Sequence, residues 1–221
     1  MIQAWQYRLL NNKPVVLIEY SQAGTYKETL QPGDYEIDLV GQGGGSANGL
    51  STSGTYSYVR GGVAGTLRVR VSITQPTTIT INLNSRNNSR TRQYSGVVAG
   101  WSGEPGGDTS ITGIPGATLI AHGGGGGSFT PTSATGGTRV SGLQGLVSVS
   151  GVKKVLINSN DNVIISTNGQ IPTTETRTAT GQLNSNYPDN PVYGAGGDGG
   201  WNGATTSTWS GRAGVVIIKS I

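Results

Sequence analysis

The chain has 221 residues, no cysteine and a formal net charge of +4, and 38 of its residues are glycine. The lack of cysteine excludes disulfides, zinc–thiolate sites and thiol nucleophiles, and the small charge does not favour nucleic acid as a partner. Hydrophobic residues make up 33% and charged residues 12%, so we expect a thin core, a surface of Ser, Thr, Asn and Gln, and no membrane span.

The N-terminal residues predict a hairpin. Two strand-forming stretches, 4–10 and 14–20, flank Asn11 and Asn12, and asparagine tolerates the positive φ of a two-residue turn. We therefore expect residues 1–20 to form a hairpin and residues 21–221 to form one glycine-rich β domain.

Residues 24–40 and 65–84 carry the clearest strand patterns. In the first, Pro32-Gly33-Asp34 predicts a turn that leads into a strand. In the second, two alternating stretches flank Gln75-Pro76, and we expect them to form an antiparallel hairpin. Alternation with a period of two predicts strands with one buried face. The alternating apolar residues are Tyr35, Ile37 and Leu39, then Leu67, Val69, Val71 and Ile73, then Ile79, Ile81 and Leu83.

The rest of the chain alternates between glycine-rich and strand-like stretches. Residues 85–145 show almost no sustained period. Strand signals return at 146–149, 152–157 and 163–165, and we expect an inserted strand-loop region near 152–193. The apolar run Val215–Ile218 predicts a buried central strand. No stretch has the period of an amphipathic helix, so the predicted fold class is an all-β, glycine-rich β-sandwich.

The glycine runs predict a core made partly of backbone. Glycine runs can adopt the polyproline II conformation, which has three residues per turn and no internal hydrogen bonds. Only glycine lets such segments approach closely, so we expect polyproline II-type segments packed against one another between the strands. The candidate structural glycines are Gly43, Gly44, Gly45, Gly123, Gly124, Gly125, Gly126 and Gly127.

Four stretches combine strand ends with glycine clusters: Ser21–Tyr26, Gln31–Gly45, Ala121–Gly127 and Gly211–Ile218. In this order they resemble the glycine-rich domain of phage tail-fibre proteins, including the tail-fibre tip adhesins of T-even-like phages. The resemblance spans roughly residues 20–221. It implies a β-sandwich, in some members with stacked polyglycine rods, and loops that contact host surface receptors.

The resemblance also implies where the protein works. It implies a tail or head fibre of a virion, extracellular on release, and a bacterial surface protein or glycan as partner. We expect other virion fibre proteins to bind residues 1–20 of this chain, an N-terminal hairpin that the family pattern does not include. The first residues, Met1–Trp5, do not have the pattern of a signal peptide, which agrees with release by lysis and equally with a cytoplasmic protein.

The motifs that could carry catalysis are weak. The glycines after Val40 lack the spacing of a dinucleotide fingerprint, and Gly123–Gly127 lacks the lysine of a P-loop. His122 is the only histidine, so we interpret it as a hydrogen-bonded side chain beside the glycine run rather than a catalytic or zinc-binding residue. Glu104 and Asp108 could act as paired carboxylates but fit turn-stabilising roles better. We therefore expect no enzyme activity, cofactor or metal.

Aromatic residues in polar loops give the strongest binding signal, because rigid rings with adaptable polar neighbours make good contact surfaces. Phe129, Trp101 and Trp201 share this setting, although the two tryptophans suit a core role better, and any of these rings could instead fill a thin core.

Arginines near Tyr94 could bind acidic sugars or form a solvated loop tip. The function predicted is a receptor-binding adhesin, with a purely structural virion component as the alternative. The candidate receptor-binding residues are Tyr56, Tyr58, Arg86, Arg90, Arg92, Tyr94, Tyr187, Tyr193 and Trp209.

Overall fold

The computed structural model describes residues 15–50, 56–59, 61–84, 91–95, 98–133, 136–140, 142–157, 163–166, 173–176, 199–202, 205–208 and 213–221. These residues form β-strands and no helix, which confirms the predicted all-β class. Within this part of the chain, no helix has the length and hydropathy that crossing a membrane requires. The strands are β1 (Val15–Tyr20), β2 (Gly24–Leu30), β3 (Gly33–Val40), β4 (Ala47–Leu50), β5 (Tyr56–Val59), β6 (Thr66–Ile73), β7 (Thr77–Leu83), β8 (Thr91–Ser95), β9 (Val98–Ser102), β10 (Thr109–Thr112), β11 (Thr118–Ala121), β12 (Ser128–Ser133), β13 (Gly136–Val140), β14 (Val147–Ser150), β15 (Lys154–Ile157), β16 (Val163–Ser166), β17 (Thr173–Thr176), β18 (Gly199–Asn202), β19 (Thr205–Thr208) and β20 (Val215–Ser220).

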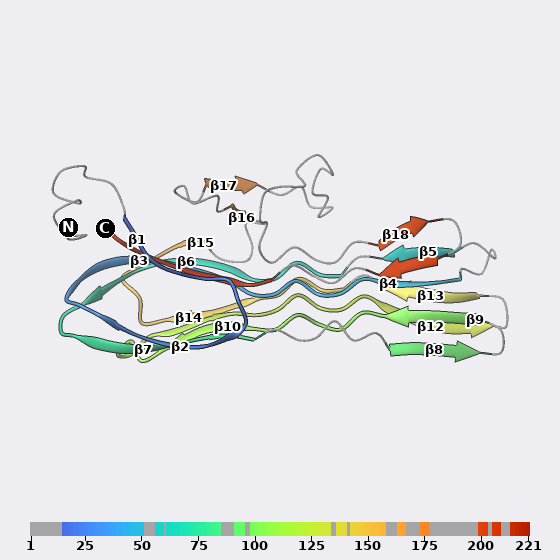
Figure 1. The fold of residues 1–221 in the computed structure, drawn as a ribbon, viewed down its shortest axis with the longest axis horizontal. Helices are drawn as coiled ribbons and strands as arrows, with labels where there is room; N and C mark the ends of the chain where they lie inside the picture. Colours follow the sequence, from blue (N-terminus) through green and yellow to red (C-terminus); the bar gives the residue numbers. More distant parts are fainter. Residues whose placement is uncertain are drawn as a thin grey trace.

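Two five-stranded antiparallel sheets form a sandwich (Figure 1). Sheet A has the order β1-β20-β3-β6-β15, and sheet B has the order β14-β11-β10-β7-β2. The alternating apolar residues of β3, β6 and β7 are buried and form one core with Leu119 of β11 and Ile218 of β20. As predicted, β20 is a buried central strand, because β1 and β3 flank it on either side.

The predicted 65–84 hairpin is wrong in its pairing, although both of its strands are present. β6 lies in sheet A between β3 and β15, while β7 lies in sheet B between β10 and β2. The chain therefore crosses from one sheet to the other at residues 74–76. A period of two identifies the apolar face of a strand but not its partner, and both apolar faces are buried when they face each other across the core.

Residues 15–20 belong to the sandwich. β1 is the second strand of the predicted N-terminal hairpin, and it pairs antiparallel with β20, with Tyr20 opposite Val216. The first strand of that hairpin, residues 4–10, lies outside the described residues. In the expected insertion, β15 pairs with β6 of sheet A and β16 pairs with β17.

Among the described residues, five extended glycine-rich segments leave the sandwich side by side and form a bundle, the wavy traces at the centre of Figure 1. They are hydrogen-bonded to one another through their backbones. We call this set the glycine bundle, and its segments are 41–46, 61–65, 103–108, 122–127 and 142–146.

Hydrogen bonds in the glycine bundle recur every three residues. Gly41 and Gly44 donate to segment 61–65, at 3.1 and 2.9 Å, and Gln42 and Gly45 donate to segment 103–108, at 2.9 and 2.8 Å. Successive residues thus bond to different neighbours, whereas a β-strand bonds to the same partner at every second residue. A repeat of three is the repeat of polyproline II. The prediction that glycine segments pack directly against one another is confirmed.

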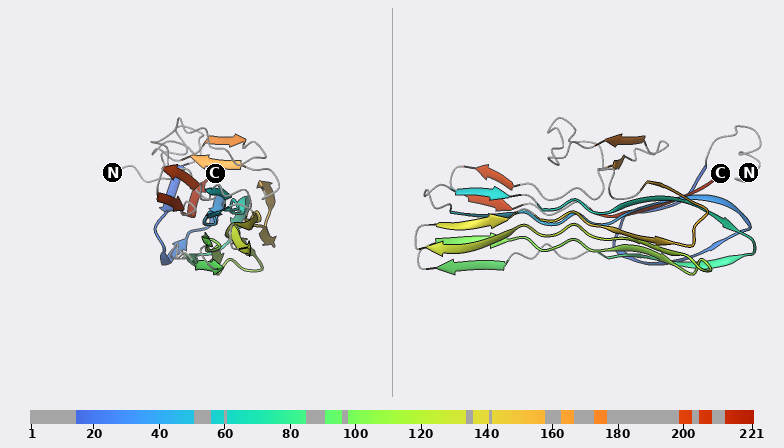
Figure 2. Two further views of the ribbon diagram at one scale, coloured as in Figure 1. Left: turned by 90° about the vertical axis from the view of Figure 1, so that its right-hand side faces the viewer. Right: turned by 180° about the vertical axis from the view of Figure 1, so that it is seen from behind.

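Four hairpins lie at the far end of the glycine bundle from the sandwich, and the view from behind shows the same three-part order (Figure 2). Strands β4, β5, β8 and β9 form sheet C, in the order β5-β4-β9-β8. Two further hairpins, β12–β13 and β18–β19, form two-stranded sheets. We call these eight strands the hairpin end. The C-terminal strand β20 and β1 lie at the opposite end, in the sandwich.

Candidate functional site: the hairpin end

Sheet C brings two groups of predicted site residues into one small sheet. Tyr56 and Tyr58 lie on β5, while Arg92 and Tyr94 lie on β8, at the two edges of the sheet. The strand registers pair Tyr58 with Asn48, Asn48 with Trp101, and Trp101 with Arg92. Tyr58 and Arg92 therefore occupy the same cross-strand row, at its two ends. The remaining candidates, Arg86, Arg90, Tyr187, Tyr193 and Trp209, lie outside the described residues.

Phe129 is part of a local core and not of a contact loop. Its side chain is fully buried on β12. Gly49 and Gly100, which face each other in sheet C, leave the space for its ring, because a Cβ at either position would overlap ring atoms. Ser102 holds the strand in place, since its hydroxyl accepts a hydrogen bond from the Phe129 amide at 2.9 Å. The sequence did not indicate this role, because the neighbours of Phe129 in the chain are polar.

Asn48 is a buried polar residue on β4 of sheet C. It is 2% exposed, and neither its amide nitrogen nor its amide oxygen has a hydrogen-bond partner among the described residues. A buried polar group without a partner costs about 1–3 kcal/mol, and such groups deserve a functional explanation. Nothing in the local sequence, Ala47-Asn48-Gly49, distinguished this asparagine from a loop residue.

Replacing Asn48 with leucine, which has nearly the same volume, is expected to raise the free energy of unfolding by about 1–2 kcal/mol, because the unpaired amide is removed. Thermal or urea unfolding measures the change. Asn82→Leu is the matched control, since Asn82 is half-buried on β7 and its side-chain oxygen accepts a hydrogen bond from Thr25 at 2.9 Å. A loss of stability in Asn48→Leu at least as large as in the control would mean that the amide is satisfied in solution.

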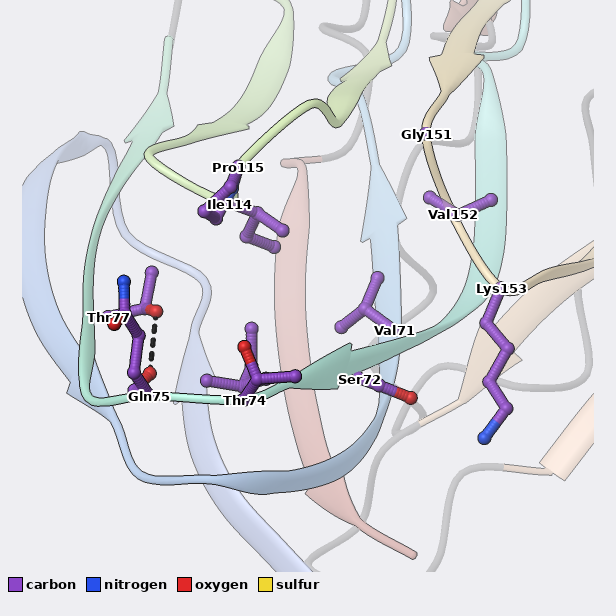
Figure 3. A pocket seen from close by; sticks show the side chains of 11 residues that line it. Val71, Ser72, Thr74, Gln75, Thr77, Ile114, Pro115, Gly151, Val152 and Lys153 are labelled. Atoms are coloured by element: carbon purple, nitrogen blue, oxygen red, sulfur yellow. Dashed lines mark hydrogen bonds between the residues drawn. The ribbon is translucent and has the colours of Figure 1, made fainter.

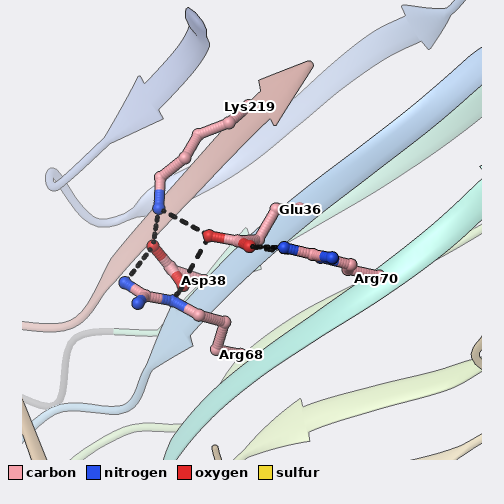
Figure 4. Close-up of polar contacts among 5 residues, drawn as sticks. All are labelled: Glu36, Asp38, Arg68, Arg70 and Lys219. Carbon is pink, nitrogen blue, oxygen red and sulfur yellow. Dashed lines mark hydrogen bonds and ion pairs between the residues drawn. The ribbon is translucent and has the colours of Figure 1, made fainter. Parts of the chain in front are cut away.

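Opposite charges are buried together on the outer face of sheet A, where Lys219, Asp38 and Glu36 converge (Figure 4). Lys219 Nζ lies 2.7 Å from Asp38 Oδ2 and 3.2 Å from Glu36 Oε1. The Arg68 Nη2 atom donates to Asp38 at 3.1 Å, and Arg70 reaches Glu36 at 3.4 Å. Burial lowers the pKa of Arg68, but the hydrogen bond and charge of Asp38, with Glu36, more than offset it and raise the pKa. This network holds β3, β6 and β20 in register.

A cavity opens at the end of the sandwich away from the glycine bundle (Figure 3). It has a volume of about 500 Å³ and lies between the β6–β7, β10–β11 and β14–β15 connections. Val71, Ile114 and Val152 give it an apolar wall, and Lys153 is its charged residue. This lining lacks an acid–base pair, so the cavity does not suggest a reaction.

His122 is hydrogen-bonded beside the glycine run, as the sequence predicted. Its Nδ1 atom lies 3.1 Å from Asp108 Oδ2, and its Nε2 atom lies 3.1 Å from Ser148 Oγ. Asp108 Oδ1 accepts a hydrogen bond from the Gly123 amide at 2.8 Å. These contacts join the ends of β10 and β11 where segments of the glycine bundle begin. The sequence did not indicate Ser148 as a partner, because it is 26 residues away.

Among the described residues, no group of three or more His, Asp and Glu side chains could hold a metal ion. Comparison with known proteins adds no assignment: no protein-family model matches the chain, and the curated proteins give no match.

Proposed function

We propose that this protein is a receptor-binding adhesin of a virion fibre, in which the hairpin end contacts a host-cell surface molecule and the sandwich end attaches to the fibre. The observation that supports this most is the separation of the two ends by the glycine bundle. Tyr56, Tyr58, Arg92 and Tyr94 gather on sheet C, at the end away from β1 and β20.

The glycine bundle suits a protein that presents a contact surface at a distance. Its segments are tied sideways by backbone hydrogen bonds of 2.7–3.1 Å, so the hairpins rest on a stiff support instead of a flexible linker. Preorganisation of this kind lowers the entropy lost on binding. Aromatic and arginine side chains are the types in which binding energy concentrates. The resemblance to tail-fibre tip adhesins points to the same function.

The double substitution Tyr58→Ala and Arg92→Ala tests the proposal. We expect it to weaken adhesion of the labelled, full-length protein to a susceptible bacterial strain at least tenfold, which corresponds to about 1.4 kcal/mol or more. Adhesion is measured by flow cytometry across a panel of strains. The control is Tyr26→Ala, since Tyr26 lies on β2 of the sandwich, far from the hairpin end.

Two results would count against the adhesin. Equal adhesion of the double variant and the Tyr26→Ala control would show that this row of sheet C is not the contact surface. Capture by other virion proteins without adhesion to any strain that the virus infects would favour the structural component instead.

A further inference from the structure

Three side chains at one corner of sheet B form a chain of hydrogen bonds from a carboxylate to a hydroxyl. Asp108 Oδ2 lies 3.1 Å from His122 Nδ1, and His122 Nε2 lies 3.1 Å from Ser148 Oγ. The order is that of a carboxylate, a base and a nucleophile, with a hydrogen bond at each step. None of these residues belongs to the hairpin end.

The hydrogen bonds allow a proton to move from Ser148 to His122. Asp108 Oδ1 already accepts from the Gly123 amide, so the ionised carboxylate accepts at both oxygens. When the neutral imidazole carries its hydrogen on Nδ1, Asp108 accepts it, and the lone pair of Nε2 faces Ser148 Oγ. A neutral imidazole in this tautomer is the form that takes a proton from a hydroxyl.

The strands hold the three residues on a rigid support that is open to solvent. β14, β11 and β10 are neighbours in sheet B, and they carry Ser148, His122 and Asp108 at or next to their ends. The side chains of His122 and Asp108 are 37% and 47% exposed. Ser148 is half-buried on an edge strand, so a small ester can reach its hydroxyl.

We propose that Ser148, His122 and Asp108 form an ester-cleaving site that acts on small acyl groups, such as an acetyl group carried on a sugar hydroxyl. Ser148 Oγ bonds to the carbonyl carbon while its proton passes to His122 Nε2. The bond from that carbon to the alcohol oxygen breaks, and the alcohol leaves with the proton from His122. Water then attacks the acyl-serine, gives a proton to His122, and releases the carboxylic acid while Ser148 regains its hydrogen. Asp108 is a positioning residue that holds the imidazole.

The test uses a fluorophosphonate probe and p-nitrophenyl acetate on the purified full-length chain. We expect the probe to modify Ser148, identified by peptide mass spectrometry, and we expect p-nitrophenyl acetate to be hydrolysed. Ser148→Ala should abolish both signals. Ser110→Ala should leave both signals unchanged, because Ser110 lies on β10 of the same sheet, outside the hydrogen-bond chain.

His122→Gln separates a catalytic role from a structural one, because glutamine keeps hydrogen-bonding capacity but cannot act as the base. We expect this variant to melt near the parent temperature and to label at least about 100-fold more slowly. A wild-type protein that does not label at Ser148, or equal labelling of a folded His122→Gln variant, would overturn the proposal. Should His122→Gln fail to fold, the comparison of Ser148→Ala with Ser110→Ala decides alone. The site lies in the sandwich, so neither outcome alters the test of adhesion by the hairpin end.

Discussion

Replacing Gly44 with alanine should lower the free energy of unfolding by about 3 kcal/mol or more, or roughly 6–12 °C in melting temperature. A Cβ on Gly44 would overlap the backbone carbonyl of Gly125 in the neighbouring segment, and a backbone atom cannot move aside as a side chain can. Segment 41–46 is also held on another side, because the Gly44 amide donates a hydrogen bond to the Gly62 carbonyl at 2.9 Å. Thermal and denaturant unfolding give the measurement.

Gly45→Ala is the matched control for this prediction. The two glycines are adjacent in segment 41–46 and both are buried, but the nearest heavy atom to a Cβ on Gly45 is 3.3 Å away, at Gly103. The cost of this close contact is offset by the smaller conformational entropy of alanine in the unfolded chain. We therefore expect the free energy of unfolding to change by no more than about 1 kcal/mol. Equal melting temperatures for the two variants would show that the glycine bundle does not pack as described.

Replacing Asp38 with asparagine should cost about 3–5 kcal/mol of folding free energy. Asp38 is fully buried, and Lys219, which is 2% exposed, lies 2.7 Å from it. Removing the negative charge leaves Lys219 and Arg68 with Glu36 as their acidic partner in the cluster (Figure 4). A buried charge that loses its partner is penalised by its desolvation, which exceeds the energy of an exposed ion pair several times over.

Asp34→Asn provides the comparison on the same strand. Asp34 pairs with Lys153 at 3.4 Å, and the two side chains are 43% and 59% exposed. Exposed pairs of this kind contribute about 0–1 kcal/mol. If Asp38→Asn and Asp34→Asn lost similar amounts of unfolding free energy in urea, solvent would have to reach the Asp38 cluster.

The sequence was informative wherever a period of two was sustained. The alternation in β3, β6 and β7 correctly predicted which side chains enter the core, and the apolar run of β20 predicted its central place. Strand partners could not be predicted, because each of these strands pairs with segments far away in the chain. The short strands β9 and β12 were missed, since Val98–Ser102 and Ser128–Ser133 contain Gly, Ser and Pro and have no sustained alternation of apolar residues.

The glycine bundle was predicted from composition, but only in part. The runs Gly43–Gly45 and Gly123–Gly127 were expected to take part, whereas three isolated pairs were overlooked. These pairs have a spacing of three, Gly62 with Gly65, Gly103 with Gly106 and Gly142 with Gly145, and a Cβ at each position would meet backbone atoms of another segment. The residues between them need not be small, as Leu143 shows with 81% exposure. A repeat of G-x-x-G was the signal to look for.

The hairpin end was the hardest part to predict. Tyr58 and Arg92 are brought into one row by two intervening strands, and the pairings of Asn48 and Trp101 that connect them have no local pattern. The same holds for Ser148, whose approach to His122 depends on the pairing of β14 with β11. Contacts of this kind follow from the topology, which the periodicity of single strands does not specify.

The repeat of three in the glycine bundle restricts how its length can change. Deleting one residue from segment 41–46 would turn everything beyond it by about 120°, so its amides would no longer face the segments they now bond to. We therefore expect the segments of the glycine bundle to tolerate insertions or deletions only in whole turns of three residues. Segments that are hydrogen-bonded to several neighbours, such as 41–46, 61–65 and 122–127, must change length together. A shaft of this construction can therefore be made longer or shorter only in discrete steps of about 9 Å, while the two ends keep their relative orientation.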